Sequence, residues 1–570
     1  MTNTDKMYIP NVNQWTRYYQ NVVSGQSNAY VNHMKSGYNK GSQSGSFMIP
    51  ISNKSYPIRA EKENNFVVRL VSPSEQIVNQ AKEEIKIDDE SINKTDRKRK
   101  YHHSPQSRGG EKKPKKSKKI KLLKNIKGYI FNIMSLLTKE NFIEAQPSEL
   151  QIFEIPPYQV GVESITYEEC RPVSQITAYN PIEFDLCANN GMDYIDLKRS
   201  KLYVKLKVKK ANGEDLQDGD TVGPVNLFLQ SLWSQLDVYI QGQMVTSSNT
   251  YYPYKCMMKT LLQYGQDAKS TQLSSSLYLK DRYGHMDEIS TNTGLYERRK
   301  FISNSKTLEM EGPIFSDIFE MDRYLLNMLS LKLKLYRNDP SFCLMSGEID
   351  TNYHISLEDV VIKLCKIRPN PAIIVAHSEA LKTTNAKYPF TKTMMKNFTI
   401  MQGSTSLIVE NVFQDVKPKS IVLGLVSSTA MSGAYTKNPF NFMNYDLKQV
   451  TLFCDGIPVD GIPLKLDFNE NSGATNVSPY VKMFETRGKW MLDTGNEITR
   501  AEFNNGYTLL CFNLEPFFSD TKYLSLLKQG KIRLECQFGT PLPETAALLI
   551  LAENYGYFEI TENRQIKIEH

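Results

Sequence analysis

Side chains that could carry out catalysis or bind a metal are few in this 570-residue chain and lie far apart along it. No pair of histidines or cysteines has a spacing typical of zinc ligands, and the HExxH, CxxC, GxSxG and phosphate-binding GxxxxGK motifs are absent. The seven histidines are His33, His102, His103, His285, His354, His377 and His570. The sequence therefore predicts no catalytic residue, no metal site and no cofactor, and favours a protein that is not an enzyme.

The eight cysteines are isolated from one another, and four of them fall within strand-like runs, namely Cys365, Cys454, Cys511 and Cys536. A reactive thiol needs an electropositive neighbourhood, which the sequence does not indicate. Buried structural thiols are therefore the favoured interpretation, and free thiols suit a reducing compartment. The adjacent carboxylates Glu168 and Glu169 are typical of a loop and are not interpreted as a glycosidase pair.

A basic tract is the strongest local signal. Lys94 to Lys127 holds 15 Lys/Arg and 2 acidic residues, which leaves 54 basic and 60 acidic residues in the rest of the chain. Closely spaced cations without apolar periodicity bind phosphate by counterion release, so the tract is predicted to bind double-stranded DNA without reading its sequence. A nuclear localisation signal or a solvated linker would have the same composition. The predicted DNA-binding residues are Arg97, Lys98, Arg99, Lys100, Arg108, Lys112, Lys113, Lys115, Lys116, Lys118, Lys119 and Lys121.

The composition changes along the chain and suggests its domains. Residues 1–93 are rich in Asn, Ser, Gln and Tyr and are predicted to form a flexible arm with one short helix within Val71–Glu90. Residues 94–133 hold the basic tract and the start of a short amphipathic stretch, Ile120–Leu137, which could dock on protein or lie on a membrane surface. No apolar run is long enough to span a membrane, and no secretory signal is recognisable, so the protein is not expected to be secreted.

From about residue 150 the pattern is that of β-strands. Within Lys201–Lys210, Leu202, Val204, Leu206 and Val208 alternate with polar side chains, which places one face of a strand on a core. Gly242 and the Asp455-Gly456 pair indicate hairpin turns. Helices are expected only at Pro224–Leu236, Tyr254–Tyr264 and Pro479–Phe484.

An internal repeat indicates two similar domains. Strand–turn–strand leads to Tyr252-Pro253-Tyr254 and a short helix in one half, and to Ser478-Pro479-Tyr480 and a short helix in the other. Phe319-x-x-Asp322-x-Tyr324-Leu325 is echoed by Phe517-x-x-Asp520-x-x-Tyr523-Leu524. The sequence therefore predicts an all-β fold of two consecutive jelly rolls (a double jelly roll) with short inserted helices, preceded by a largely disordered basic N-terminal arm. We expect the first jelly roll within 134–378 and the second within 379–570.

From Met134 to its end, the chain resembles the major capsid proteins of Maverick/Polinton elements and adintovirus-like viruses. The residues that carry the resemblance are Asp193-Tyr194-Ile195-Asp196-Leu197, Val222 to Leu229 with Ser231-Leu232, Tyr252-Pro253-Tyr254, Asn385-Ala386-Lys387-Tyr388-Pro389, Lys437 to Phe442 and Gly506-Tyr507-Thr508-Leu509. The first 130 residues depart from this pattern and are similar to a separate small basic protein of the same elements.

The resemblance implies a structural major capsid protein whose homotrimers tile an icosahedral shell around double-stranded DNA. Implied partners are other copies of the chain, minor capsid or penton proteins, the viral DNA and an adenovirus-type cysteine protease, which could cut beside Gly109 and Gly110. The implied location is the virion, assembled in the host nucleus or cytoplasm. The long segment Asp267–Asp317 is expected to form a tower or an inter-subunit contact, and the C-terminal residues a tail that ties neighbours together.

A different function remains open from the residues alone. Two β-sandwiches could form a carbohydrate- or protein-binding module without catalytic activity. That function would need exposed aromatic side chains, and the chain has only Trp15, Trp233 and Trp490 as tryptophans, of which Trp233 is expected in the core.

Overall fold

The computed structural model describes residues 147–569 apart from short gaps, together with three strands between 46 and 70; the gaps are 151, 154, 156, 178–179, 187–190, 247–248, 349–350, 415, 469–475 and 516–527. The chain divides into two units, residues 1–159 and 160–570. The predicted helix within Val71–Glu90, the basic tract and the amphipathic stretch Ile120–Leu137 lie outside the described residues.

The first unit contains a small antiparallel sheet. Its strands are β1 (Ser46–Ile51), β2 (Lys54–Ala60) and β3 (Val68–Leu70), in the order β1-β2-β3. The sequence analysis expected a flexible arm here and missed these strands, because each is too short to show a sustained alternation. A single 3-10 turn, η2 (Ser148–Leu150), follows in this unit.

The second unit begins with eight strands that form two facing antiparallel sheets. One sheet has the order β10-β6-β13-β4 and the other β5-β11-β8-β9. The strands are β4 (Val162–Cys170), β5 (Ile182–Asp185), β6 (Tyr194–Lys210), β8 (Trp233–Ile240), β9 (Gln243–Met244), β10 (Leu308–Pro313), β11 (Leu331–Arg337) and β13 (Tyr353–Pro369). A short pair, β7 (Val222–Pro224) with β12 (Leu344–Ser346), is added beside them.

Eight further strands repeat this arrangement in the second half. The sheets have the orders β14-β24-β17-β21 and β15-β23-β18-β19. The strands are β14 (Ala386–Ile400), β15 (Ser406–Val409), β17 (Ser420–Ser427), β18 (Leu447–Cys454), β19 (Ile457–Pro458), β21 (Leu509–Asn513), β23 (Ile532–Phe538) and β24 (Ala546–Ile560). Three short strands extend these pairings, with β20 (Leu464–Lys465) on β18 and β16 (Val416–Lys417) on β22 (Lys528–Gln529).

The two halves have the same strand order. Each strand of the first half has an equivalent at the same place in the sheets of the second half. In chain order, the strands β4, β5, β6, β8, β9, β10, β11 and β13 correspond to β14, β15, β17, β18, β19, β21, β23 and β24. Two four-stranded sheets with this connectivity form a jelly roll. The chain therefore has the predicted double jelly-roll fold. The boundary predicted at 378/379 falls inside α10 (Pro371–Leu381), which links β13 to β14, and it stays a prediction.

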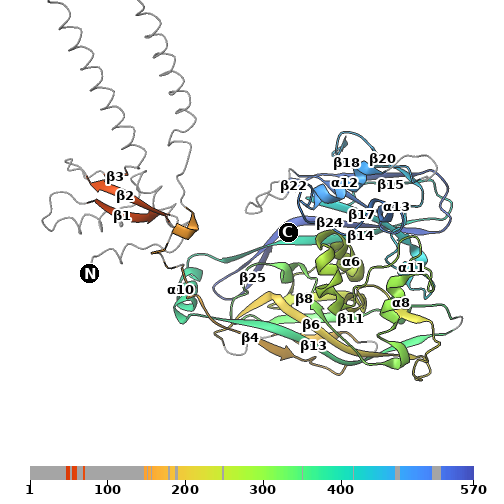
Figure 1. The fold of residues 1–570 in the computed structure, drawn as a ribbon, viewed down its shortest axis with the longest axis horizontal. Coiled ribbons are helices and arrows are strands. Elements are labelled where there is room, and N and C mark those ends of the chain that lie inside the picture. Colours follow the sequence, from red (N-terminus) through yellow and green to blue (C-terminus); the bar gives the residue numbers. More distant parts are fainter. Residues whose placement is uncertain are drawn as a thin grey trace, which may run out of the picture. The chain divides into compact units, whose positions relative to one another are not determined.

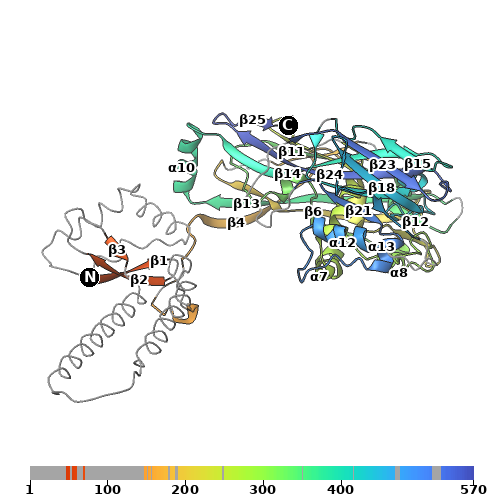
Figure 2. The ribbon, with the colours of Figure 1, turned by 90° about the horizontal axis from the view of Figure 1, so that it is seen from above.

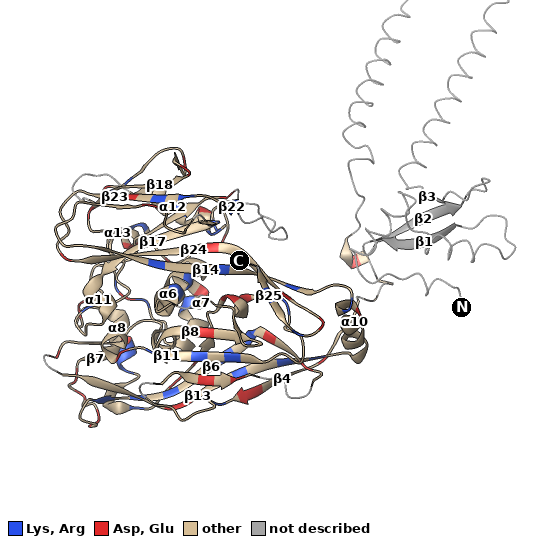
Figure 3. Cartoon of the chain, turned by 180° about the vertical axis from the view of Figure 1, so that it is seen from behind, with Lys and Arg blue, Asp and Glu red and all other residues tan. Residues whose placement is uncertain are grey.

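Strand β6 illustrates how the sequence specifies the layers. Leu202, Val204, Leu206 and Val208 are at most 2% exposed, and burying each contributes roughly 1.5–3 kcal/mol. The lysines that alternate with them point away from the core and pair with acidic side chains on neighbouring strands, as Lys205 Nζ does with Glu309 Oε1 at 3.7 Å. In Figure 3, blue residues mark β6, and red residues lie on the strands beside it.

Inserted helices occupy the same place in both halves. Between β9 and β10 lie α6 (Tyr252–Gln263), α7 (Gln266–Ser270) and α8 (Thr293–Arg299), and between β19 and β21 lie α12 (Val477–Thr486) and α13 (Arg500–Asn504). Figure 1 shows α6 between β8 and β14, and Figure 2 shows α7, α8, α12 and α13 along one side. The helices predicted near 254–264 and 479–484 are confirmed.

The helix predicted over Pro224–Leu236 is wrong. The chain there forms the end of β7, the single turn α5 (Phe228–Ser231) and the start of β8. Every residue from Val222 to Trp233 is buried, so the run has no polar face from which a helical period could be told apart. Leu227 also adopts a left-handed backbone with φ of 53°, which interrupts a helix.

Two segments with predicted roles between subunits also pack within the chain, and those roles stay predictions. The segment Asp267–Asp317, expected to form a tower or an inter-subunit contact, contributes β10 to a sheet and buries Tyr278 and Leu295. The C-terminal tail ends in β25 (Ile566–Glu569), which pairs with β24 of the same chain. No helix among the described residues is long and apolar enough to cross a membrane.

Candidate functional site: the contact between the two jelly rolls

The predicted DNA-binding residues and the predicted cleavage site, Gly109 and Gly110, lie outside the described residues and stay predictions. Within the described part of the chain, no group of histidine, cysteine and carboxylate side chains could hold a metal ion. His285 contacts Glu288 at 2.8 Å on the surface, and His377 contacts the Tyr194 hydroxyl at 3.0 Å. Neither histidine has a nucleophile beside it among these contacts.

The thiols are structural, as the sequence predicted. Cys365, Cys511 and Cys536 lie buried in β13, β21 and β23, and Cys454 is half-buried in β18. Burial raises the pKa of Cys511 and of Cys536 to about 12. These thiols stay protonated at neutral pH and are poor nucleophiles.

The tryptophans give little support to a carbohydrate-binding module. Trp233 is fully buried, as predicted, and Trp490 is 48% exposed in the segment between α12 and α13. Trp15 lies outside the described residues.

Four of the motifs that carry the family resemblance meet where the two jelly rolls touch. Tyr254 packs edge-to-face on Phe342 of its own half and on Phe440 of the second half, with centroid distances of 5.8 and 5.7 Å. The Tyr507 hydroxyl donates to the Asp281 carbonyl at 2.8 Å, although 226 residues separate them. Buried aromatic pairs of this kind contribute about 0.5–1.5 kcal/mol beyond their area.

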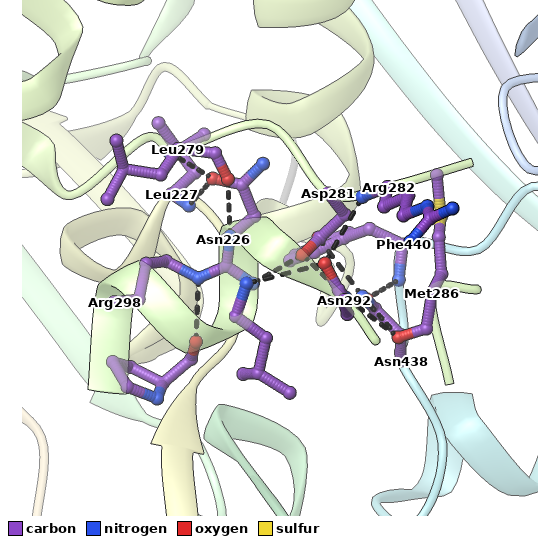
Figure 4. Close-up of polar contacts among 12 residues, drawn as sticks. Asn226, Leu227, Leu279, Asp281, Arg282, Met286, Asn292, Arg298, Asn438 and Phe440 are labelled. Carbon is purple, nitrogen blue, oxygen red and sulfur yellow. Dashed lines mark hydrogen bonds and ion pairs between the residues drawn. The ribbon is translucent and has the colours of Figure 1, made fainter. Parts of the chain in front are cut away.

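A buried ion pair lies at the centre of this contact. Arg298 of α8 and Asp281 are 0% and 2% exposed, and Arg298 Nη2 lies 2.6 Å from Asp281 Oδ1. The same guanidinium donates to the carbonyl oxygens of Pro224, at 2.8 Å, and Leu279. Figure 4 shows the side chain reaching from α8 into the centre of the network. Because the guanidinium is buried away from water, it needs each of these partners; an unpaired buried charge would destabilise the fold.

Asparagines join the two halves through the same carboxylate. Asn292 Nδ2 donates to Asp281 Oδ1 at 2.9 Å, and Asn438 Nδ2, from the second half, donates to Asp281 Oδ2 at 3.1 Å. Asn226 Oδ1 accepts from the backbone N–H of Leu279 at 2.9 Å (Figure 4). Asp281 therefore binds both an arginine of the first half and an amide of the second half. These shared bonds fix the position of one jelly roll relative to the other.

A second group of buried charges lies between α6 and β14. Asp317 is 4% exposed; its Oδ1 lies 2.7 Å from Lys255 Nζ, and its Oδ2 accepts from the backbone N–H of Thr393 at 2.8 Å. Lys259, which is 1% exposed, lies 2.8 Å from Glu320. Burial alone would raise the pKa of Asp317, but Lys255 and Lys259 outweigh it and the pKa is lowered. The aspartate therefore stays ionised and ties α6 to the backbone of β14.

Arg487 and Glu553 extend these charges into the second half. Arg487 Nη1 lies 2.7 Å from both carboxylate oxygens of Glu553, and both side chains are at most 10% exposed. Burial favours the neutral acid, yet Arg487 outweighs it and lowers the pKa of Glu553. The pair fixes the helix α12 to β24.

A buried lysine marks the contact between the two sets of inserted helices. Lys269 of α7 is 2% exposed, and its Nζ donates to the carbonyls of Leu261 at 3.0 Å and Asn496 at 2.6 Å. Burial lowers its pKa to about 7, and Glu497 opposes that shift. The lysine is therefore only partly protonated at physiological pH.

The remaining two motifs meet at a cleft of about 580 Å³ beside α10. Tyr194 of β6 and Tyr388 of β14 line it together with His377 and Leu381 of α10. Arg368 Nε holds Asp193 at 2.9 Å beside it. The cleft therefore lies where the linking helix leaves β13 and the second jelly roll begins.

Sequence reasoning did not identify the residues of these networks. Asp281, Asn292 and Arg298 lie in the segment Asp267–Asp317, which was expected to form a tower or an inter-subunit contact. The one available signal was that the resemblance motifs keep polar residues, such as Asn226 and Asn438, inside apolar runs. Buried polar groups in such runs need hydrogen-bond partners, which points to a packed contact.

No known protein-family profile matches the chain. An uncharacterized protein of Caenorhabditis elegans is 25% identical over 402 residues, which is 68% of this chain and 93% of that protein. Among solved structures, a chain of the Sputnik virophage determined by cryo-EM superposes with a TM-score of 0.52 and 14% identity, over 75% of this chain and 93% of that chain. The mavirus major capsid protein superposes with a TM-score of 0.45 and 11% identity, over 82% of this chain and 97% of that protein. The likeness to the Sputnik chain covers 75% of this chain and supports the double jelly-roll fold.

Proposed function

We propose that the chain is the major subunit of a viral capsid, a structural protein whose homotrimers tile an icosahedral shell around double-stranded DNA. The observation that carries the proposal is the repetition of one eight-stranded jelly roll, with one strand order, twice in a single chain. Three such chains present six similar jelly rolls in a ring. A tile of that shape can pack with few distinct contacts, because rotation by one sixth presents a similar surface.

The finer assignment is to the capsid proteins of Maverick/Polinton elements and adintovirus-like viruses. It is supported by the motifs of that resemblance, which lie at the contact between the jelly rolls and at the α10 cleft instead of being scattered over the surface. Residues that build the internal contact of a capsid subunit are those expected to define its family. Minor capsid or penton proteins would be its neighbours in the virion.

The N-terminal residues have a separate role in the proposal. The basic tract binds the packaged DNA, since its 15 Lys/Arg attract the phosphates, whereas the rest of the chain holds more acidic than basic residues. A viral cysteine protease cuts within the tract, beside Gly109 and Gly110, and so releases its basic end. Catalysis by the chain itself is not part of the proposal.

Expression of the full chain and electron microscopy of the purified product test the proposal. We expect trimers with a six-lobed outline and closed shells, and a mass in light scattering of about three times 65.3 kDa for the unassembled subunit. An obligate contact of this kind should bury upwards of roughly 2,000 Å². A stable monomer at micromolar concentration, without particles, would contradict it.

A further inference from the structure

The cleft beside α10 has walls that are mostly apolar. Figure 2 shows α10 at the end of the long strands β13 and β14, and the cleft of about 580 Å³ is lined by this helix and by strands of both jelly rolls. Ligand pockets of proteins typically measure about 300–1,000 Å³ and are lined mainly by apolar side chains. The cleft therefore has the size and the lining of a small-molecule site. Its apolar lining residues include Leu326, Ile367, Pro369, Ile373, Ala380 and Leu381.

Hydrogen bonds between its walls hold the cleft in shape. At the start of α10, Asn370 Oδ1 accepts from the N–H of Ala372 at 3.0 Å, and the N–H of Asn370 donates to the Gly161 carbonyl at 3.0 Å. Further along the helix, His377 Nδ1 lies 3.0 Å from the Tyr194 hydroxyl, which ties α10 to β6. The site is therefore formed before any ligand arrives, and binding does not have to order the helix.

The polar groups of these walls are bound within the chain. The Tyr388 hydroxyl donates to the Tyr324 carbonyl at 3.1 Å and accepts from the Leu326 N–H at 3.2 Å. Asn385 Nδ2 donates to Glu559 Oε2 at 2.8 Å. A peptide in the cleft would leave some of its own backbone N–H and C=O groups without partners, which is unfavourable. A hydrocarbon chain needs no such partners and therefore suits these walls better.

The charged side chains at the cleft leave one cation without a carboxylate. Asp322, the carboxylate of the lining, pairs with Lys198 at 2.6 Å, and Lys387 Nζ lies 3.7 Å from Glu559. Arg323 Nη1 donates to the Lys387 carbonyl, and this guanidinium forms no ion pair with any residue that the structure describes. A guanidinium has five N–H donors, so most of them remain for a ligand. The cleft therefore favours an anionic group beside Arg323.

Arg564 adds a second positive charge near the cleft. Its Nη2 donates to Asn327 Oδ1 at 2.7 Å, and its Nη1 is buried without a hydrogen-bond partner in the described part of the chain. Burial raises the pKa of Tyr194 and of Tyr388, and the charge of Arg564 opposes both shifts, so it lies close enough to act on the lining. The positive potential of the cleft is therefore not confined to one side chain.

We propose that the cleft beside α10 binds an amphiphile of the fatty-acid class, with a single hydrocarbon chain and an anionic head. The chain lies against Ile367, Ile373 and Leu381. The head is bound by Arg323, and Arg564 adds to the attraction. An apolar cavity of about 150 Å³ already binds benzene, so this cleft has room for a longer hydrocarbon. The inference goes beyond the proposed capsid role and does not depend on it.

Displacement of a fluorescent fatty acid, dansylaminoundecanoic acid, from the full chain measures the binding. Decanoate, dodecanoate and tetradecanoate should displace the probe with increasing affinity. Each added methylene should tighten binding by roughly fourfold, which is the ratio expected for burying one CH₂ group. An affinity that does not change with chain length would mean that charge alone attracts the acid, and it would overturn the inference, as would a failure of the full chain to bind the probe.

Filling the cleft tests where the hydrocarbon chain lies. Ala380→Trp places a large side chain in the lining, and Ala376→Trp is the matched control, because Ala376 is exposed on the same helix and outside the lining. Ala380→Trp should weaken probe binding by about tenfold or more at an unchanged thermal midpoint, while Ala376→Trp binds like the wild type. The basic tract also attracts anions, but that binding would be equal in all three proteins. Probe binding that Ala380→Trp does not reduce would therefore contradict the inference.

Removing the cation tests the binding of the head. Arg323→Gln is compared with Lys382→Gln, since Lys382 pairs with Glu379 at 2.7 Å and lies outside the lining. Arg323 is exposed, so water screens its charge, and its loss should weaken dodecanoate by roughly two- to fivefold while leaving the uncharged dodecanol unchanged. Lys382→Gln should change neither ligand. Equal losses for the acid and the alcohol in Arg323→Gln, or no loss of the acid, would overturn the inference.

Discussion

Replacing Arg298 by methionine should destabilise the folded body strongly. Methionine keeps most of the volume of the side chain but removes the donors to Asp281 and to the carbonyls of Pro224 and Leu279. Asp281 then keeps only its neutral amide donors, Asn292 and Asn438. The carboxylate is 2% exposed, so water cannot replace the lost arginine.

The size of the effect follows from this burial. Removing one partner of a buried ion pair costs about 3–5 kcal/mol, because the remaining charge is left uncompensated. At roughly 2–4 °C per kcal/mol, for an unfolding unit the size of one jelly roll, the thermal midpoint should fall by roughly 6–20 °C. Arg298→Lys retains the charge without the planar fork and should lie between the wild type and Arg298→Met.

Differential scanning fluorimetry of the full chain, with Trp233 fluorescence as a second probe, measures the shift. Lys300→Met is the matched control, since it removes another cation at the end of the same helix whose pair with Glu297 is more than half exposed. Exposed pairs are screened by water, so the control should change the midpoint little. If Arg298→Met shifts the midpoint no further than Lys300→Met, the buried network does not hold the two jelly rolls together and the reasoning is wrong.

The affinity of the full chain for DNA should fall by roughly 10³–10⁵ between about 50 and 200 mM salt, if six to ten phosphates are neutralised. Binding should disappear when the twelve predicted DNA-binding residues are replaced by glutamine. If filter binding shows an affinity that does not change with salt concentration, the tract is a localisation signal or a linker. The free energy of unfolding should rise from about pH 7 to pH 10, because the unfolded chain binds a proton at Lys269 that the folded chain, with its lowered pKa of about 7, has lost; urea titrations of Lys269→Met should show a smaller rise. Alkylation of the native chain followed by peptide mapping should leave Cys256, Cys343, Cys511 and Cys536 unmodified, and their labelling before unfolding would contradict their burial.

The fold was predictable where one face of a helix or strand is exposed to solvent and the other face is buried. Strand β6 shows its alternation because its lysines face solvent, and the repeated Tyr-Pro-Tyr and Ser-Pro-Tyr helices mark the same insertion in both halves. The helix predicted within Val222–Trp233 was wrong because every residue of this run is buried. Its apolar residues therefore show neither the period of two of a strand nor the period of 3.6 of a helix.

The candidate site was not predictable from local patterns. Asn438 and Asp281 are separated by 157 residues, and nothing in the residues around either one indicates the other. Polar side chains in a loop are more often solvated than buried, and only the folded arrangement shows that these are shared across a contact. The resemblance motifs pointed to the correct residues without indicating why those residues belong together.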